Sequence, residues 1–155
     1  MKNIYSAPAK IILFGEHAAV YGKPAIAVPV SALRASASVH PEATGTGLHI
    51  EAMDLAQVLP VTIETDLMDN ALIYTAQQVL KKLNAKPPDA TIKLTSQIPM
   101  ASGLGSGAAV STALARAVAG AVGQILDDDA LNQLIFDIEK LYHGTPSGID
   151  NTVIV

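Results

Sequence analysis

Apolar residues near the start of the chain follow the pattern of extended strands. Residues 3–14 are predicted to be extended, with a kink at Pro8, and residues 25–39, which are rich in small and β-branched side chains, are predicted to form one or two strands. Residues 15–24 lie between them and contain Gly22 and Pro24, which favour a loop or a short helix. Consecutive strands joined by so short a connection pair antiparallel. The pattern therefore predicts an antiparallel opening to the fold.

Shorter apolar stretches follow a surface turn that is predicted at residues 40–47, where proline and glycine are frequent. Residues 48–53 and 58–64 are predicted to be short strands. Residues 90–98 alternate apolar and polar side chains, which is typical of a strand with one buried face. The side chains expected on that face are Ile92, Leu94 and Ile98.

Helical spacing of apolar residues appears in the second half of the chain. Residues 69–83 are predicted to form a helix that Asp66 or Asp69 caps and that ends by Pro87. An alanine-rich helix is predicted over 108–122, and an amphipathic helix with an acidic cap over 128–142. The positions at this spacing are Ala71, Leu72, Thr75, Val79, Leu80 and Leu83 in the first helix and Leu131, Leu134, Ile135, Ile138 and Leu141 in the last.

The final residues, 143–155, form a predicted loop that leads into an apolar run, which we interpret as the beginning of a strand. A strand cut off at its first residues would lack partners for its main-chain groups. We therefore expect the natural polypeptide to continue beyond Val155. The elements together predict an α+β fold in which an antiparallel sheet packs against helices on one side.

Composition adds an apolar surface to this picture. Of the 155 residues, 50% are hydrophobic and only 15% are charged, and the mean hydropathy is +0.35. Every apolar run is interrupted well before the roughly 18 residues that a membrane span requires. Lys10 and Glu16 interrupt the first run, so no secretory leader is predicted. We expect a cytoplasmic domain whose apolar surface is covered by a C-terminal domain, a second chain or the other copy in a homodimer.

Charge and cysteine content exclude several classes of function. The net charge of −4 and the isoelectric point near 5.4 argue against nucleic-acid binding, which usually requires a basic face. The chain has no cysteine, which excludes a disulfide framework and a thiolate metal site and is typical of a reducing compartment. Any phosphate must therefore be bound by local groups.

A glycine-rich turn at residues 99–107 runs directly into the alanine-rich helix. Gly103, Gly105 and Gly107 can adopt positive φ and let a ligand approach the main chain, while Ser102 and Ser106 offer hydroxyls. The free N–H groups and the positive dipole end of the helix point back at the turn. These features favour a phosphate-binding turn.

Other interpretations of the turn need to be weighed. A P-loop is excluded because no lysine lies between Lys93 and Lys140. A dinucleotide-binding fingerprint stays open, since Gly103, Gly105 and Ala108 match G-x-G-x-x-A, but its second strand would have to be residues 122–126. The third interpretation is that the glycines only let the helix pack closely.

Ionisable residues at both ends of the chain add a second signal. Lys10 interrupts an apolar strand, which is costly unless the lysine is paired. Asp150 follows a Ser-Gly loop, and we expect it to be the partner of Lys10. Taken singly, each has an ordinary alternative, because a strand-edge lysine can extend to solvent and a loop aspartate is common.

Three blocks of sequence together resemble the GHMP small-molecule kinases, and most closely the branch that phosphorylates mevalonate. The blocks are SAPAKIILFGEHAAVYGKPAIAVPV, PMASGLGSGAAVSTALA and HGTPSGIDN. The resemblance covers nearly the whole chain but only the first half of such an enzyme. It implies that residues 1–155 are the N-terminal, ATP-binding domain, with a ribosomal-protein-like antiparallel sheet against helices, and that the C-terminal domain is absent.

The resemblance also implies roles for individual residues. Asp150 would be the catalytic aspartate at the mevalonate hydroxyl, and Lys10 would neutralise charge at the transferred phosphoryl group. Glu16 and His17 would bind substrate, and Glu139 with Ser106 would bind the Mg²⁺ that accompanies ATP. The residues implied around the ATP phosphates are Pro99, Ser102, Gly103, Leu104, Gly105, Ser106, Gly107 and Ala108.

Gly107 departs from the family pattern, which commonly has a serine there as a hydroxyl on the Mg²⁺ side. Ser106, Ser111 or water would have to replace that hydroxyl, or metal binding is weaker. Two alternatives to mevalonate phosphorylation stay open: an inactive nucleotide- or metabolite-binding module, and a GHMP kinase for a related small alcohol.

Overall fold

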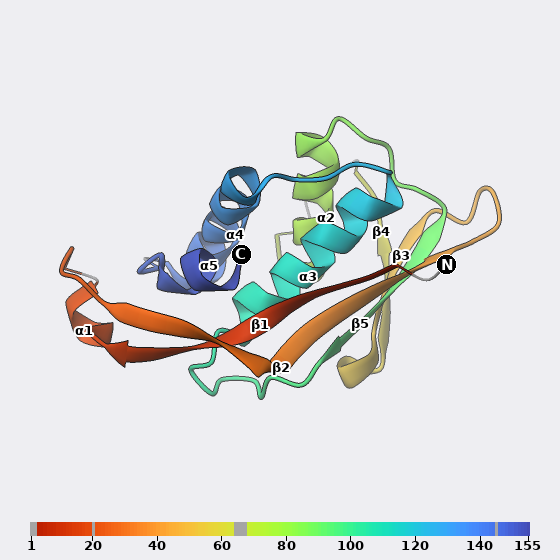
Figure 1. Cartoon of the computed structure of the whole chain (residues 1–155). Coiled ribbons are helices and arrows are strands. Elements are labelled where there is room, and N and C mark those ends of the chain that lie inside the picture. The colour runs from red at the N-terminus through yellow and green to blue at the C-terminus, as the bar shows by residue number, and fades with distance from the viewer. Residues whose placement is uncertain (1–2, 20, 64–67, 145) are drawn as a thin grey trace.

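The structure of the chain, a computed structural model, describes residues 3–19, 21–63, 68–144 and 146–155. Its strands and helices form the α+β fold expected from the sequence (Figure 1). In chain order the elements are β1 (Asn3–Phe14), α1 (Glu16–Ala19), β2 (Ile26–Pro41), β3 (Leu48–Ala52), the 3-10 turn η1 (Met53–Leu55), β4 (Gln57–Val61), α2 (Ala71–Lys82), β5 (Ala90–Ser96), α3 (Ser106–Ala121), α4 (Asp128–His143) and α5 (Ile149–Ile154).

The five strands form one sheet in the order β1-β2-β5-β3-β4. The expectation of a fully antiparallel sheet is wrong, because β3 and β5 pair in parallel, with Ile50 opposite Ile92. The connection from β3 to β5 passes through β4 and α2, and a crossover of that length allows parallel pairing. The antiparallel opening is confirmed, since β1 pairs with β2 from Asn3↔Val39 to Phe14↔Ile26.

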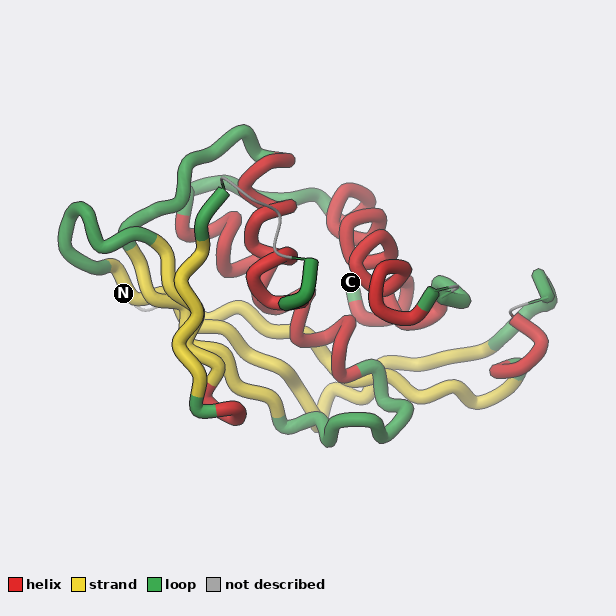
Figure 2. The backbone as a smooth tube through the Cα atoms, turned by 180° about the vertical axis from the view of Figure 1, so that it is seen from behind, coloured by secondary structure: helices red, strands yellow, loops and turns green. Residues whose placement is uncertain are grey.

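Helices α2, α3 and α4 cover one face of the sheet, and the hydrophobic core lies between these two layers (Figures 1 and 2). Alanines of α3, among them Ala109, Ala113 and Ala117, are fully buried, and such small side chains let the helix approach β1 and β2 closely. The β1–β2 hairpin projects beyond the helical layer and carries α1 at its end (Figure 1). None of the helices in the described ranges is long and apolar enough to cross a membrane.

Strand boundaries differ from the predicted ones by a few residues. The stretch predicted at 25–39 is a single long strand, β2, which covers Ile26–Pro41, so the predicted turn at 40–47 begins later than expected. The short strands predicted at 48–53, 58–64 and 90–98 are confirmed as β3, β4 and β5 with shifted ends. Residues 122–126 form no strand, so the second strand that a dinucleotide-binding fold requires is absent.

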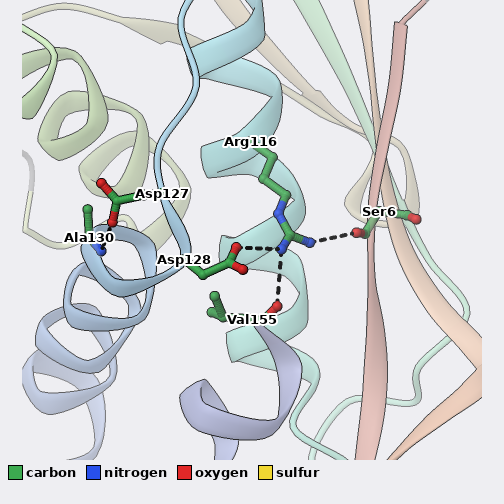
Figure 3. Close-up of polar contacts among 6 residues, drawn as sticks. All are labelled: Ser6, Arg116, Asp127, Asp128, Ala130 and Val155. Atoms are coloured by element: carbon green, nitrogen blue, oxygen red, sulfur yellow. Dashed lines mark hydrogen bonds and ion pairs between the residues drawn. The ribbon is translucent and has the colours of Figure 1, made fainter.

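Helix caps explain where α2 and α4 begin. Asn70 caps α2, since its side-chain oxygen accepts hydrogen bonds from the main-chain N–H groups of Leu72 and Ile73. The prediction of Asp69 as the cap is therefore wrong by one residue, and Asp66 lies outside the described residues. The acidic cap of α4 is confirmed, because Asp127 accepts a hydrogen bond of 2.7 Å from Ala130 N (Figure 3).

The segment after Gly148 corrects a second prediction. Its β-branched residues suggest a strand, but residues 149–154 form helix α5. Propensity is weak against packing, and in helical form Asn151 and Ile154, three residues apart, are both buried. The Thr152 hydroxyl also donates a hydrogen bond of 2.7 Å to Gly148 O.

Asp89 stabilises the turn at residues 42–47, and this contact predicts a pH dependence. Hydrogen bonds from Gly47 N, at 2.7 Å, and from the main chain of Gly45 and Thr46 lower the pKa of Asp89 below its ordinary value of 3.8. A lowered folded-state pKa stabilises the fold above pH 3.8, and the effect is lost as the pH falls through the folded-state pKa. We expect Asp89→Asn to lower the free energy of unfolding at pH 7.

Urea unfolding of both proteins between pH 7 and pH 2 measures this difference. We expect the gap between wild type and Asp89→Asn to be constant near neutral pH and to close in acid. A gap that keeps the same size in acid would show that the carboxylate charge is not responsible.

Candidate active site

Lys10 and Asp150 form an ion pair that joins the first strand to the last helix. The Nζ atom of Lys10 lies 2.9 Å from Oδ1 of Asp150, and the two side chains are 5% and 29% exposed. Lys10 is in the middle of β1, and Asp150 is in the first turn of α5. The predicted pairing of these residues is confirmed. Because the buried ammonium needs this partner, the ion pair holds the charge of Lys10 in a fixed place.

The glycine-rich turn packs directly against this pair. Lys10 N donates a hydrogen bond of 3.0 Å to Leu104 O, although Lys10 and Leu104 are far apart in the sequence. Gly105 has φ +72°, and a Cβ atom there would lie 2.7 Å from Ile154 Cδ1 and 3.0 Å from Lys10 Cγ. Only glycine fits this backbone and this space. The packing interpretation of the turn is therefore correct for Gly105, and it is compatible with phosphate binding.

The start of α3 has the properties of an anion site. Gly105 occupies the N-cap position in the left-handed conformation, and no side chain caps the helix. Helices α2 and α4 both have side-chain caps. The first intrahelical bond is Ala109 N to Gly105 O, so the N–H groups of Ser106, Gly107 and Ala108 have no helical acceptor. These donors and the helix dipole favour a negatively charged ligand.

The other predicted residues of the turn contribute mainly through the backbone. The Ser102 hydroxyl donates to Pro99 O at 2.7 Å, and the Ser106 hydroxyl donates weakly to Ile98 O at 3.4 Å. The side chain of Ala108 is fully buried, so only its main chain can face a ligand. Helix α3 begins at Ser106, two residues before the predicted start. Ser111 is buried within α3, which leaves Ser106 as the better placed hydroxyl.

Glu139 reaches the same place from α4. A Cβ atom on Gly107 would lie 3.1 Å from Oε1 of Glu139, so the carboxylate lies beside the first turn of α3. Glu139 and Asp150 both line a pocket of about 230 Å³, together with Pro146, Ser147, Gly148 and Asn151. In the part of the chain that the structure describes, no three His, Asp or Glu side chains form a cluster that could hold a metal ion alone. A cation here would need ligand oxygens from a bound phosphate or water.

Glu16 and His17 are not part of this cluster. Both are exposed in α1, at the end of the β1–β2 hairpin (Figure 1), and neither lines the pocket of Glu139 and Asp150. The other predicted residues come together from β1, the glycine-rich turn, α4 and α5. The substrate-binding role of Glu16 and His17 stays a prediction.

Sequence reasoning missed two polar residues that contact the segments carrying the ion pair. Asn151 is 6% exposed, and its Nδ2 donates a hydrogen bond to Oδ1 of Asn132 on α4. Its position directly after Asp150 is the sequence feature that could have identified it. Arg116 is the one charged residue in the alanine-rich stretch 108–122, and this feature could have identified it.

Comparison with known protein families identifies the family of this chain. A sequence model described as the N-terminal domain of GHMP kinases matches residues 70–155, which include the glycine-rich turn, Glu139 and Asp150. The chain belongs to the GHMP kinases. Membership in the GHMP kinases removes the dinucleotide-binding alternative, in agreement with the missing strand at 122–126.

Individual GHMP kinases are similar to nearly the whole chain. The mevalonate kinase of Thermococcus onnurineus is 39% identical over 168 residues, which covers 99% of this chain and 49% of that protein. The crystal structure of Methanococcus jannaschii mevalonate kinase matches with a TM-score of 0.88 and 28% identity, and covers 99% of this chain and 51% of that one. The structure of L. major mevalonate kinase in complex with R-mevalonate matches with a TM-score of 0.69 and 28% identity, over 98% and 46% of the two chains. The chain thus spans about half the length of the curated relatives it matches.

Proposed function

We propose that the chain forms the ATP-binding half of an enzyme that transfers the γ-phosphate of ATP to the primary hydroxyl of mevalonate, giving 5-phosphomevalonate and ADP. One observation carries the proposal. The Lys10–Asp150 ion pair touches the glycine-rich turn through the Lys10–Leu104 hydrogen bond, in a chain 39% identical to the mevalonate kinase of T. onnurineus. A cytoplasmic location in the pathway to isoprenoids is part of this proposal.

The geometry suggests how the proposed reaction would proceed. The free N–H groups of α3 would hold the ATP phosphates, which places the terminal phosphate near the Lys10 ammonium. Asp150 would accept the hydroxyl proton of mevalonate or orient that hydroxyl, while Lys10 neutralises charge that develops on the transferred phosphoryl group. Phosphoryl transfer depends mainly on positioning and charge neutralisation, so these few groups are sufficient for their part of the site.

The donors around Glu139 fit a magnesium ion that arrives with ATP. Mg²⁺ prefers one or two carboxylates together with phosphate oxygens and water, and Glu139 and Asp150 line the same pocket. Glu139 and the Ser106 hydroxyl would hold the ion, which when bound neutralises phosphate charge. Glu16 and His17 would bind mevalonate from the hairpin.

The rest of the cleft would come from outside this chain. We propose that residues 1–155 are one N-terminal domain and that a C-terminal domain completes the site, either in the same polypeptide or through a second chain, including a homodimer partner. Exposed apolar residues on the hairpin support this proposal, since Phe14 is 70% exposed and Ile26 is 55% exposed.

Mevalonate-dependent release of ADP tests the proposed function. The assay uses the full-length polypeptide, meaning this chain with the half that the relatives carry beyond it, and the 155-residue chain beside it. We expect turnover with mevalonate by the full-length polypeptide, and much less with phosphomevalonate or galactose. ATP binding without turnover of any alcohol would instead favour a nucleotide-binding module, and preference for another alcohol would change the substrate.

Gly107→Ser tests the proposed metal site. The new Cβ would lie 3.1 Å from Oε1 of Glu139, so the carboxylate must shift by a few tenths of an ångström and the added hydroxyl would lie beside it. Interactions with a charged group contribute about 1.5–3 kcal/mol, so we expect the Mg²⁺ concentration for half-maximal rate to fall by about tenfold. The matched control is Gly107→Ala, which adds the same Cβ without the hydroxyl. Equal magnesium titrations for Ser and Ala variants would contradict the assignment of this position to metal binding.

A further inference from the structure

Helix α5 (Ile149–Ile154) carries Asp150 in its first turn. Its position depends on groups outside the helix: Ile154 is buried in the core, and Asn151 is hydrogen-bonded to Asn132. The orientation of the Asp150 carboxylate toward Lys10 therefore depends on how α5 is held.

Arg116 contacts both segments that carry the ion pair. It lies on α3, and its guanidinium group contacts β1, the residue after α5 and the start of α4 (Figure 3). Nη1 donates a hydrogen bond of 3.3 Å to Ser6 O, and Nη2 donates one of 3.1 Å to Val155 O. The same Nη2 lies 3.8 Å from Oδ1 of Asp128.

The two main-chain acceptors are close to the ion pair along the sequence. Ser6 precedes Lys10 on β1. Val155 comes immediately after helix α5, which carries Asp150. One planar guanidinium group with fixed donor directions thus spans the strand that holds Lys10 and the helix that holds Asp150. Asp128 is 84% exposed, and such a surface ion pair contributes little. The main-chain contacts are the important ones.

We infer that Arg116 is a positioning residue that holds α5 against β1, and thereby keeps the Asp150 carboxylate in contact with the Lys10 ammonium. The structural part of this inference is independent of the reaction. Its catalytic consequence rests on the proposed function, because a misplacement of about 1 Å in a phosphoryl-transfer site is sufficient to lower kcat by about 100-fold.

Hydrogen exchange in the full-length polypeptide tests the structural part. Arg116→Met keeps the aliphatic length and removes all the donors, and Arg116→Lys keeps the charge but cannot span both acceptors. We expect amide exchange of residues 149–155 to become about tenfold faster in Arg116→Met and less so in Arg116→Lys, while α2 changes by less than about twofold. The control is Asp128→Asn, which should leave α5 unchanged. Unchanged exchange in α5, or an equal increase in α2, would overturn the inference.

Steady-state kinetics tests the catalytic part with ATP and mevalonate. A positioning role predicts a fall in kcat of about 10- to 100-fold with both KM values within about threefold, and a partial recovery in Arg116→Lys. An unchanged kcat, or a loss confined to KM, would overturn it. If the wild type shows no turnover with mevalonate, the proposed function fails, and the exchange comparison alone decides whether Arg116 holds α5. Arg116→Lys serves both measurements if Arg116→Met does not fold.

Discussion

Asp150→Asn in the full-length polypeptide is expected to lower kcat for mevalonate phosphorylation by about 1,000-fold or more, because an amide cannot accept the hydroxyl proton. The substitution also leaves the Lys10 ammonium, in a side chain only 5% exposed, beside a neutral group. Binding of ATP should change little, since the N–H groups at the start of α3 are not altered. Coupled ADP release measures kcat, and titration calorimetry measures the dissociation constant of ATP.

Asp137→Asn is the matched control for this variant. Asp137 is an exposed carboxylate on α4, where it accepts a hydrogen bond of 3.0 Å from Gln133, and it lies outside the pocket. We expect its kinetics to equal those of the wild type. A near-normal kcat for Asp150→Asn would refute the assigned role. Loss of ATP binding together with kcat would show that the variant disturbs the glycine-rich turn.

Gly105→Ala is expected to destabilise the fold and to separate the glycine-rich turn from the ion pair. The new Cβ would lie 2.7 Å from Ile154 Cδ1 and 3.0 Å from Lys10 Cγ, so α5 or Lys10 must move. Such overpacking costs about 1–3 kcal/mol, and the left-handed backbone at φ +72° adds about 1–2 kcal/mol for a residue with a Cβ. Urea unfolding of the 155-residue chain measures the total loss.

Gly103→Ala is the matched control that measures the backbone cost without the packing cost. Gly103 has nearly the same backbone conformation, with φ +74°, but a Cβ there meets nothing within 4 Å. We therefore expect Gly103→Ala to show only the backbone cost, about 1–2 kcal/mol. The difference between the two variants then reports how tightly the turn packs against Lys10 and α5. Equal losses would show that this contact contributes nothing.

Much of the candidate site could be predicted because its signals are local or chemically costly. The glycine-rich turn is recognisable from its composition, and Lys10 is conspicuous as a charge in an apolar strand. The need of Lys10 for a partner led to Asp150, and the two atoms lie 2.9 Å apart. The proximity of Glu139 to Gly107 came from the family resemblance, because no local pattern links α4 to the start of α3.

Other parts of the site could not be predicted, since they depend on where distant segments meet. Arg116 was passed over because its acceptors are main-chain oxygens of Ser6 and Val155, and every residue offers such an oxygen. Asn151 was passed over because its partner Asn132 lies on another helix. Main-chain acceptors and pairs of neutral side chains leave no distinctive residue pattern in a sequence.

The sequence by itself determined the helices α2 and α4, the strands β1 and β5 and the glycine-rich turn, because periodicity, caps and glycine conformations act within a few residues. Only the tertiary structure decided the parallel pairing of β3 with β5 and the helical state of residues 149–154. Both depend on contacts between residues far apart in the chain. For α5 those contacts, with Lys10, Arg116 and Asn132, outweigh the strand propensity of its β-branched residues.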